Sequence, residues 1–85
     1  MKHSTYILYS KSRDKYYIGY TSSLESRVQK HNLGGTASTR TGKPWNLVYS
    51  EEFETKTEAL KREKYIKRMK SRTYIERLIK NSSDG

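Results

Sequence analysis

The chain has no cysteine among its 85 residues, which excludes disulfides, zinc–thiolate sites and cysteine nucleophiles. It also lacks a long apolar run, so we expect neither a signal peptide nor a transmembrane helix, and we expect a cytoplasmic protein. Only 32% of the residues are hydrophobic, and Tyr alone accounts for 8 of them. Such a composition approaches that of disordered chains, but the regular periodicities described below predict a folded domain.

Acidic residues are few, with 9 Asp and Glu against 18 Lys and Arg, which leaves a net charge of +9. The length predicts one small domain, which we place at residues 1–80, followed by a flexible tail at 81–85. The excess of positive charge favours a polyanionic partner, and the aromatic residues between the basic ones favour nucleic acid over a membrane. The alternative is a charge that serves solubility alone.

One segment, Lys15–Thr21, holds three tyrosines in five residues and predicts a strand. Side chains alternate along a strand, so one face is bulky and the other places the Tyr17 phenol beside Gly19. A glycine within a strand often marks the close approach of a ligand or of another backbone. We therefore hypothesise that Tyr17 takes part in chemistry above an open floor.

Two further strands are predicted by alternation of apolar residues. Residues 5–9 pair with the tyrosine-rich strand as an antiparallel hairpin. A third strand ends at about Phe53, with Leu47, Tyr49 and Phe53 on one face. Between the second and third strands, residues 35–43 form a polar loop that either contacts phosphates or only connects.

Three helices are predicted from capping signals and helical periodicity. Ser22 and Thr55 each precede a glutamate by three residues, which is the capping-box spacing. Gly34 suits the end of the first helix, the second runs to about Met69, and Ser71 suits the start of the third. The chain is therefore predicted to be a small α/β (α+β) fold, a three-stranded antiparallel sheet flanked by helices in the order β-β-α-β-α-α.

Two ionisable side chains fall on inward helix faces. His31 shares a face with Leu24 and Val28, and Arg27 precedes it by one turn. Such a histidine either only packs in the core or takes part in the function of the protein. Glu63 lies within an inward stripe of apolar residues, while Arg62 points elsewhere. A carboxylate there is costly unless it is paired, for example with Arg27, or serves as a metal ligand or general base.

Four of the residues named above are expected to lie close together in the fold. Tyr17, Arg27, His31 and Glu63 are predicted to converge on one surface of the sheet. Polar residues that interrupt the apolar pattern in several elements indicate either an active site or a buried ion network. The basic residues of 56–80 then form a ridge beside this surface that suits phosphate contacts.

The order and spacing of these residues resemble the GIY-YIG nuclease family. Ser4-Thr5-Tyr6 occupies the place of the first triplet, keeping only its tyrosine, and Tyr17-Ile18-Gly19 matches the second. Arg27, His31 and Glu63 match the arginine, histidine and metal-binding glutamate of the family. The resemblance extends to about Ile79, and the family's later asparagine has no counterpart in Tyr74–Lys80. The chain is most similar to short bacterial members related to the nuclease module of the excision-repair incision subunit.

The resemblance implies an endonuclease that hydrolyses DNA phosphodiesters with one divalent ion, Mg²⁺ or Mn²⁺. It implies that Glu63 holds the metal, that Arg27 stabilises charge on the phosphate, and that Tyr6 or Tyr17 activates water with help from His31. A hard cation suits one carboxylate with waters and phosphate oxygens, and a metal stabilises the leaving oxygen. A phenol needs nearby cations to act as a base at neutral pH.

The resemblance also implies partners. We expect DNA as the substrate, in repair or recombination, selected by its structure, with Lys43, Arg62 and Lys67 as contacts. A protein partner would supply targeting. The alternatives are a non-catalytic nucleic-acid-binding module and a structural domain in which Arg27 and Glu63 pair.

Overall fold

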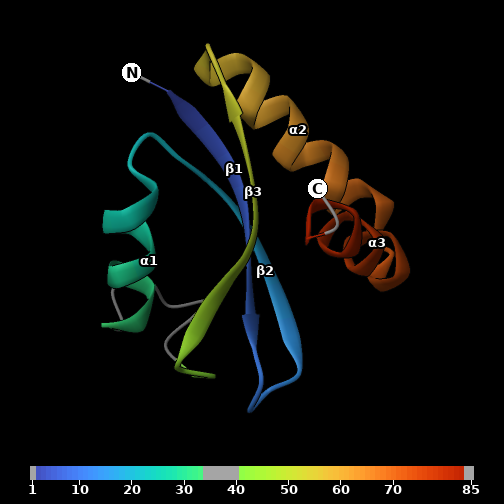
Figure 1. Ribbon diagram of the computed structural model, residues 1–85. Helices are drawn as coiled ribbons and strands as arrows, with labels where there is room; N and C mark the ends of the chain where they lie inside the picture. Colours follow the sequence, from blue (N-terminus) through green and yellow to red (C-terminus); the bar gives the residue numbers. More distant parts are fainter. Residues whose placement is uncertain (1, 34–40, 84–85) are drawn as a thin grey trace.

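A computed structural model describes residues 2–33 and 41–83 and shows one antiparallel sheet with helices on both faces (Figure 1). The strands are β1 (His3–Ser10), β2 (Lys15–Thr21) and β3 (Trp45–Phe53). The helices are α1 (Leu24–Asn32), α2 (Lys56–Met69) and α3 (Arg72–Ser83). Helix α1 covers one face of the sheet, and α2 and α3 cover the other. The predicted fold class and element order are confirmed.

The first strand lies at the centre of the sheet, whose strand order is β2-β1-β3. Because β1 alternates, it contributes to a core on each face. Tyr6 and Leu8 pack with Trp45 beneath α1. Ile7 packs with Ile66 and other apolar residues of α2 and α3 on the opposite face.

The pairing of β1 with β2 confirms the two faces predicted for the tyrosine-rich strand. Tyr6 lies opposite Gly19, and Leu8 lies opposite Tyr17. Directly opposed residues share a face. Tyr6, Tyr17 and Gly19 therefore all point toward the side that α1 covers.

A bulge in β3 overturns the prediction that Leu47, Tyr49 and Phe53 share a face. Leu8 pairs with Leu47, whereas Ile7, its immediate neighbour, pairs with Tyr49. The extra residue of a bulge reverses the alternation beyond it. Leu47 consequently lies on the α1 side, 41% exposed, while Tyr49 packs on the α2 and α3 side.

The helix starts agree only in part with the predicted capping boxes. Thr55 caps α2 as expected, because its hydroxyl accepts a hydrogen bond from the Glu58 amide. At α1 the prediction is wrong, since the helix begins after Ser23, whose side chain makes no cap bond. Thr21 takes this place instead: its hydroxyl accepts from the Ser23 amide and donates to the Ser23 carbonyl.

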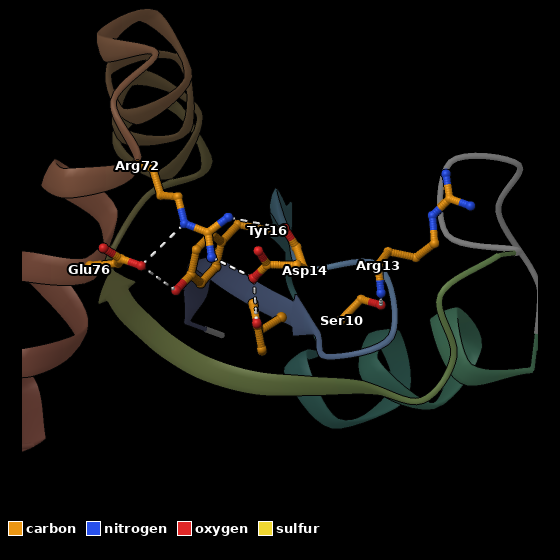
Figure 2. A network of polar contacts seen from close by, with 7 residues as sticks. Ser10, Arg13, Asp14, Tyr16, Arg72 and Glu76 are labelled. Carbon is orange, nitrogen blue, oxygen red and sulfur yellow. Dashed lines mark hydrogen bonds and ion pairs between the residues drawn. The ribbon is translucent and has the colours of Figure 1, made fainter.

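The last helix is joined to the β1–β2 turn by a polar network. Ser71 caps α3 as predicted, accepting from the Tyr74 amide. Figure 2 shows Arg72 reaching from the start of α3 to Asp14 and Glu76, and Tyr16 reaching Glu76. These contacts fix α3 against the hairpin. The helix also continues to Ser83, past residue 81 where the tail was expected to begin.

Some predictions fall outside the described residues. The expected cap at Gly34 and most of the loop at residues 35–43 belong to this group. Within the described ranges, no helix is long and apolar enough to cross a membrane.

Candidate active site

The centre of the candidate site is a hydrogen bond between a tyrosine and a histidine. Tyr6 comes from β1 and His31 from the last turn of α1, which packs over that strand. The Tyr6 hydroxyl lies 2.8 Å from His31 Nε2, and the two residues are 1% and 0% exposed. The prediction that His31 points inward is confirmed. Its ring contacts Tyr6, the tyrosine of the first triplet in the family resemblance.

The electrostatics of the pair indicate which atom holds the proton. Burial raises the pKa of Tyr6, and the charge of Arg27 opposes this rise only in part. Burial lowers the pKa of His31, and the positive charges of Arg27 and Lys30 lower it further. A neutral imidazole offers one nitrogen as an acceptor. Both groups are therefore neutral at rest, with the phenolic proton on Tyr6, and the imidazole tautomer sets which of the two donates in this hydrogen bond.

Tyr17 lies beside this pair and is half-buried. Its ring meets the His31 ring edge-on at 4.8 Å between centroids and lies 6.3 Å from the Tyr6 ring. The Trp45 ring makes a second edge-on contact with Tyr17, at 6.4 Å between centroids. The structure thus brings Tyr6, Tyr17 and His31 into one aromatic cluster beneath α1.

The role expected for Gly19 changes with the structure. A Cβ at this position would lie 2.5 Å from the Tyr6 hydroxyl oxygen and 3.0 Å from the Tyr17 ring. The first of these contacts is closer than real Cβ atoms show, and the second is unusually tight. The missing side chain therefore makes room for the two phenols. The space beside Tyr17 that was expected to be open is filled by the Tyr6 hydroxyl.

Arg27 lies one turn before His31 and lines a shallow hollow of about 250 Å³ at the start of α1. Ser22, Ser26 and Lys30 line the same hollow, so hydroxyls and positive charges surround it. The charge of Arg27 lowers the pKa of Tyr6, against the larger effect of burial, which places its guanidinium within electrostatic reach of that hydroxyl.

Glu63 belongs to α2, which covers the other face of the sheet (Figure 1). Thr5, a residue of the first triplet, holds this part of α2 against the central strand. The Thr5 hydroxyl donates to the Ala59 carbonyl at 2.6 Å, one turn before Glu63. The Glu63 carboxylate pairs with Lys67 at 3.0 Å, not with Arg27, and its side chain is 16% exposed. Its charge adds to the rise in the pKa of Tyr6 that burial dominates, so it acts on the same hydroxyl as Arg27.

A bound metal would have few protein ligands here. Among the described residues, no group of three or more His, Cys, Asp and Glu side chains is placed to hold an ion. A single carboxylate nevertheless suits Mg²⁺, which keeps several waters and binds through one or two carboxylates and substrate phosphates. Glu63 fits this description, since a partly exposed carboxylate with one exposed lysine partner is open to a competing cation.

The three predicted DNA contacts lie in different surroundings. Lys43 is exposed ahead of β3, and Lys67 is exposed but paired with Glu63. Arg62 does not point away from the sheet as predicted. It donates to Glu51 of β3 at 2.9 Å and is only 25% exposed.

Two positioning residues were missed by sequence reasoning. Thr5 anchors α2, and its only signal was its place in the first triplet. Asn32 anchors α1, because its side-chain amide accepts from the Trp45 amide at 2.6 Å and donates to the Trp45 carbonyl at 3.0 Å. Asn32 follows His31 directly, so this bond pair fixes the helix end that carries the histidine. No local pattern marked it.

Several UPF0213 proteins are similar to this chain in sequence or in structure. A UPF0213 protein of Staphylococcus saprophyticus is 48% identical over 67 residues, covering 78% of this chain and 80% of its own. A UPF0213 protein of Staphylococcus haemolyticus is 45% identical over the same shares. The solution structure of a UPF0213 protein from Bacillus halodurans covers 94% of this chain and 84% of its own, with 37% identity and a TM-score of 0.59.

The match to a protein family covers more of the chain than either staphylococcal relative does. Residues 2–76 match the GIY-YIG catalytic domain, from the start of β1 into α3. All five residues of the predicted constellation lie inside this range. The chain belongs to the GIY-YIG family.

Proposed function

We propose that this protein is a metal-dependent endonuclease that hydrolyses phosphodiester bonds in DNA. The observation that carries the proposal is the 2.8 Å hydrogen bond between the Tyr6 hydroxyl and His31 Nε2. In the tautomer whose Nε2 is unprotonated, the imidazole is a proton acceptor for the phenol, whose pKa Arg27 and Glu63 influence from two helices. Family membership supports nuclease chemistry on this scaffold.

The proton path follows from this bond. An attacking water transfers a proton to the Tyr6 oxygen as the Tyr6 proton moves to His31 Nε2. A phenol alone is a poor base at neutral pH. With a neutral imidazole as its acceptor, no free phenolate has to form in the resting protein. Tyr17, half-buried beside both rings, forms the solvent-facing wall of this cluster.

The charged residues act on the phosphate. Arg27 stabilises the negative charge that develops on its oxygens, since its guanidinium already lies within electrostatic reach of Tyr6. Glu63 would hold one Mg²⁺ or Mn²⁺ ion, which supplies a Lewis acid for the phosphate and its leaving oxygen. Lys67 pairs with the Glu63 carboxylate at rest. It would become available for a phosphate contact when that carboxylate binds the divalent ion instead. Branched or nicked repair and recombination intermediates are the substrates we would try first.

Cleavage assays test the proposal. Branched, nicked and intact duplex DNA are incubated with Mg²⁺ or Mn²⁺ and with wild type, Glu63→Gln or Tyr6→Phe. We expect both variants to lose cleavage by at least about a hundredfold. Glu52→Gln is the matched control, because it removes an exposed carboxylate of β3. Equal cleavage by wild type and Glu63→Gln would contradict the proposal, and metal-independent binding without cleavage would favour a non-catalytic DNA-binding module.

A further inference from the structure

A hollow of about 290 Å³ lies where the edge strand β2 meets the end of α2 and the start of α3. We call it the α2–α3 hollow, and it includes Lys15, Ile18, Ile66, Lys70, Arg72 and Ile75. It lies on the face opposite to Tyr6 and His31 and is not lined by either. Its composition is unusual for a surface depression, because isoleucines form the floor and basic residues form the rim.

The floor belongs to the hydrophobic core. Ile66 and Ile75 are 1% and 8% exposed, and Ile18 packs against the same cluster. These side chains are rigidly packed, so the floor is preformed rather than adaptable. A flat apolar group of the ligand can contact Ile18, which is partly exposed above them, without displacing the core.

The rim carries more positive charge than the protein neutralises. Arg72 is bound by Asp14 and Glu76, and Lys67 by Glu63. Lys15 and Lys70 form no ion pair with any described residue and are exposed. An apolar floor beside two unpaired ammonium groups is complementary to a ligand with a flat apolar part and a negative part.

The backbone holds one of these lysines at the rim. Lys70 has a φ of 47°, a left-handed conformation, and ends α2 with its amide bonded to the Lys67 carbonyl. Glycine or asparagine usually occupies such a position because a longer side chain is disfavoured there. A lysine at this point keeps a charge over the hollow at a small conformational cost.

The walls of the hollow are also fixed. Figure 2 shows Tyr16 and Arg72 facing each other, with Asp14 and Glu76 at either side of the guanidinium. The Arg72 guanidinium lies 5.2 Å from the Tyr16 ring centre and donates to Asp14 at 2.5 Å. The wall therefore does not have to be ordered when a ligand binds, which reduces the entropic cost of binding.

The hollow is close to the proposed metal-binding carboxylate along α2. Lys67 lies one turn beyond Glu63 and lines the hollow, and Lys70 follows three residues later. At about 1.5 Å per residue, Lys70 is about 10 Å from Glu63 along the helix axis. That distance corresponds to about three nucleotide steps of about 3.4 Å on one strand.

We propose that the α2–α3 hollow binds one unpaired nucleotide of the DNA substrate. The base packs on the isoleucine floor, and the phosphate is bound by Lys15 and Lys70. Bases within a duplex are stacked and paired and cannot enter such a site without being extruded. The inference rests on the proposed function and narrows its substrate to DNA with a single-stranded flap, overhang or bulge near the cut.

Binding without cleavage provides the test. Fluorescence anisotropy with a chelator present compares a blunt duplex, the same duplex with a short single-stranded overhang, and one whose overhang is abasic. We expect wild type to favour the normal overhang by about fivefold or more over the abasic one, since removing the base also removes the apolar area that it buries in the hollow. The double variant Lys15→Gln/Lys70→Asn should lose this preference and bind the overhang about tenfold more weakly.

A control variant of equal charge separates the hollow from general attraction. Lys61→Gln/Lys64→Gln removes two exposed lysines of α2 that do not line the hollow and should keep the overhang preference. The inference is overturned if both double variants weaken the binding of all three DNA probes equally. It is also overturned if wild type binds the normal and the abasic overhang alike. Because no cleavage is needed, this result is independent of the Glu63→Gln assay that tests the proposed function.

Discussion

At the scale of single residues, this protein satisfies its buried polar groups one by one. Among the described residues, no buried side-chain nitrogen or oxygen lacks a hydrogen-bond partner. Tyr6 is bound to His31, and Thr5 to the Ala59 carbonyl. An unpaired group at such positions would be costly. Each buried polar side chain among the described residues therefore has at least one partner, and the pairing of Tyr6 with His31 sets the state of the candidate site.

The neutral state of His31 makes stability depend on pH. Because the folded protein lowers the pKa of this group below 6.5, the unfolded chain binds more protons as the pH falls. We therefore expect the free energy of unfolding to be greatest above about pH 6.5 and to decrease on acidification until the folded pKa is passed. Urea unfolding measured on both sides of this pH tests it.

Two variants locate the pH effect. His31→Gln should lessen the loss of stability on acidification, whereas His3→Gln, at the other histidine, should retain it. Cleavage should decline over the same range, because protonated His31 cannot accept the Tyr6 proton. An unchanged pH dependence in His31→Gln would show that the histidine is not held neutral.

At the scale of secondary-structure elements, the sheet positions each functional helix through a specific contact. Asn32 binds both backbone groups of Trp45 and so fastens α1 to β3. Thr5 binds the Ala59 carbonyl and so fastens α2 to β1. In an α-helix that carbonyl also accepts the amide four residues on, which is that of Glu63. The placement of Glu63 thus depends on a residue of the central strand.

Thr5→Val tests this dependence. The change keeps the shape of the side chain but removes the hydrogen bond, and we expect a loss of roughly 1 kcal/mol in unfolding free energy. The Ala59 carbonyl keeps its helical partner, so the fold should persist while cleavage falls. Thr73→Val, at an exposed position of α3, is the matched control. Full activity in Thr5→Val would show that Glu63 does not depend on this anchor.

At the scale of the whole molecule, charge joins segments that are far apart in the chain. The Arg72 guanidinium binds both the carbonyl and the carboxylate of Asp14, 58 residues away. Asp14 also accepts from the Tyr9 hydroxyl. This group of contacts connects the β1–β2 turn with α3 across an exposed surface, where salt screens such interactions.

Asp14→Asn should therefore lower the melting temperature at low salt and have little effect at high salt. Asparagine tolerates the left-handed backbone of this position, where φ is 52°, so the change removes charge without strain. The hydrogen bond from Tyr9 and the contact with Arg72 lower the pKa of Asp14. The stabilisation is then present above about pH 3.8 and is lost as the pH falls through the lower folded value.

Glu25→Gln, which removes an exposed acid of α1, is the control for this measurement. It should not reproduce the salt-dependent difference, because no ion pair of the described residues includes Glu25. A salt-independent effect of Asp14→Asn would instead assign its contribution to the Tyr9 hydrogen bond.

Much of the fold was predictable because periodicity is a property of the backbone. The alternation in Lys15–Thr21 placed Tyr17 and Gly19 on one face, and helical spacing placed His31 inward, as the structure confirms. The capping box at Thr55 was recognisable for the same reason, since its partner is three residues away. Signals of this kind need no knowledge of distant segments.

Other features were decided only by the tertiary structure. The bulge in β3 depends on its register with β1, and Glu63 pairs with Lys67 rather than with Arg27 because α1 and α2 lie on opposite faces of the sheet (Figure 1). Gly19 gives the clearest example, because its purpose depends on Tyr6 lying opposite on another strand. The sequence by itself determined which residues face inward where the local periodicity is unbroken, as at Tyr17 and His31. Packing between elements determined what they meet there, because a contact depends on the relative placement of segments that local periodicity does not encode.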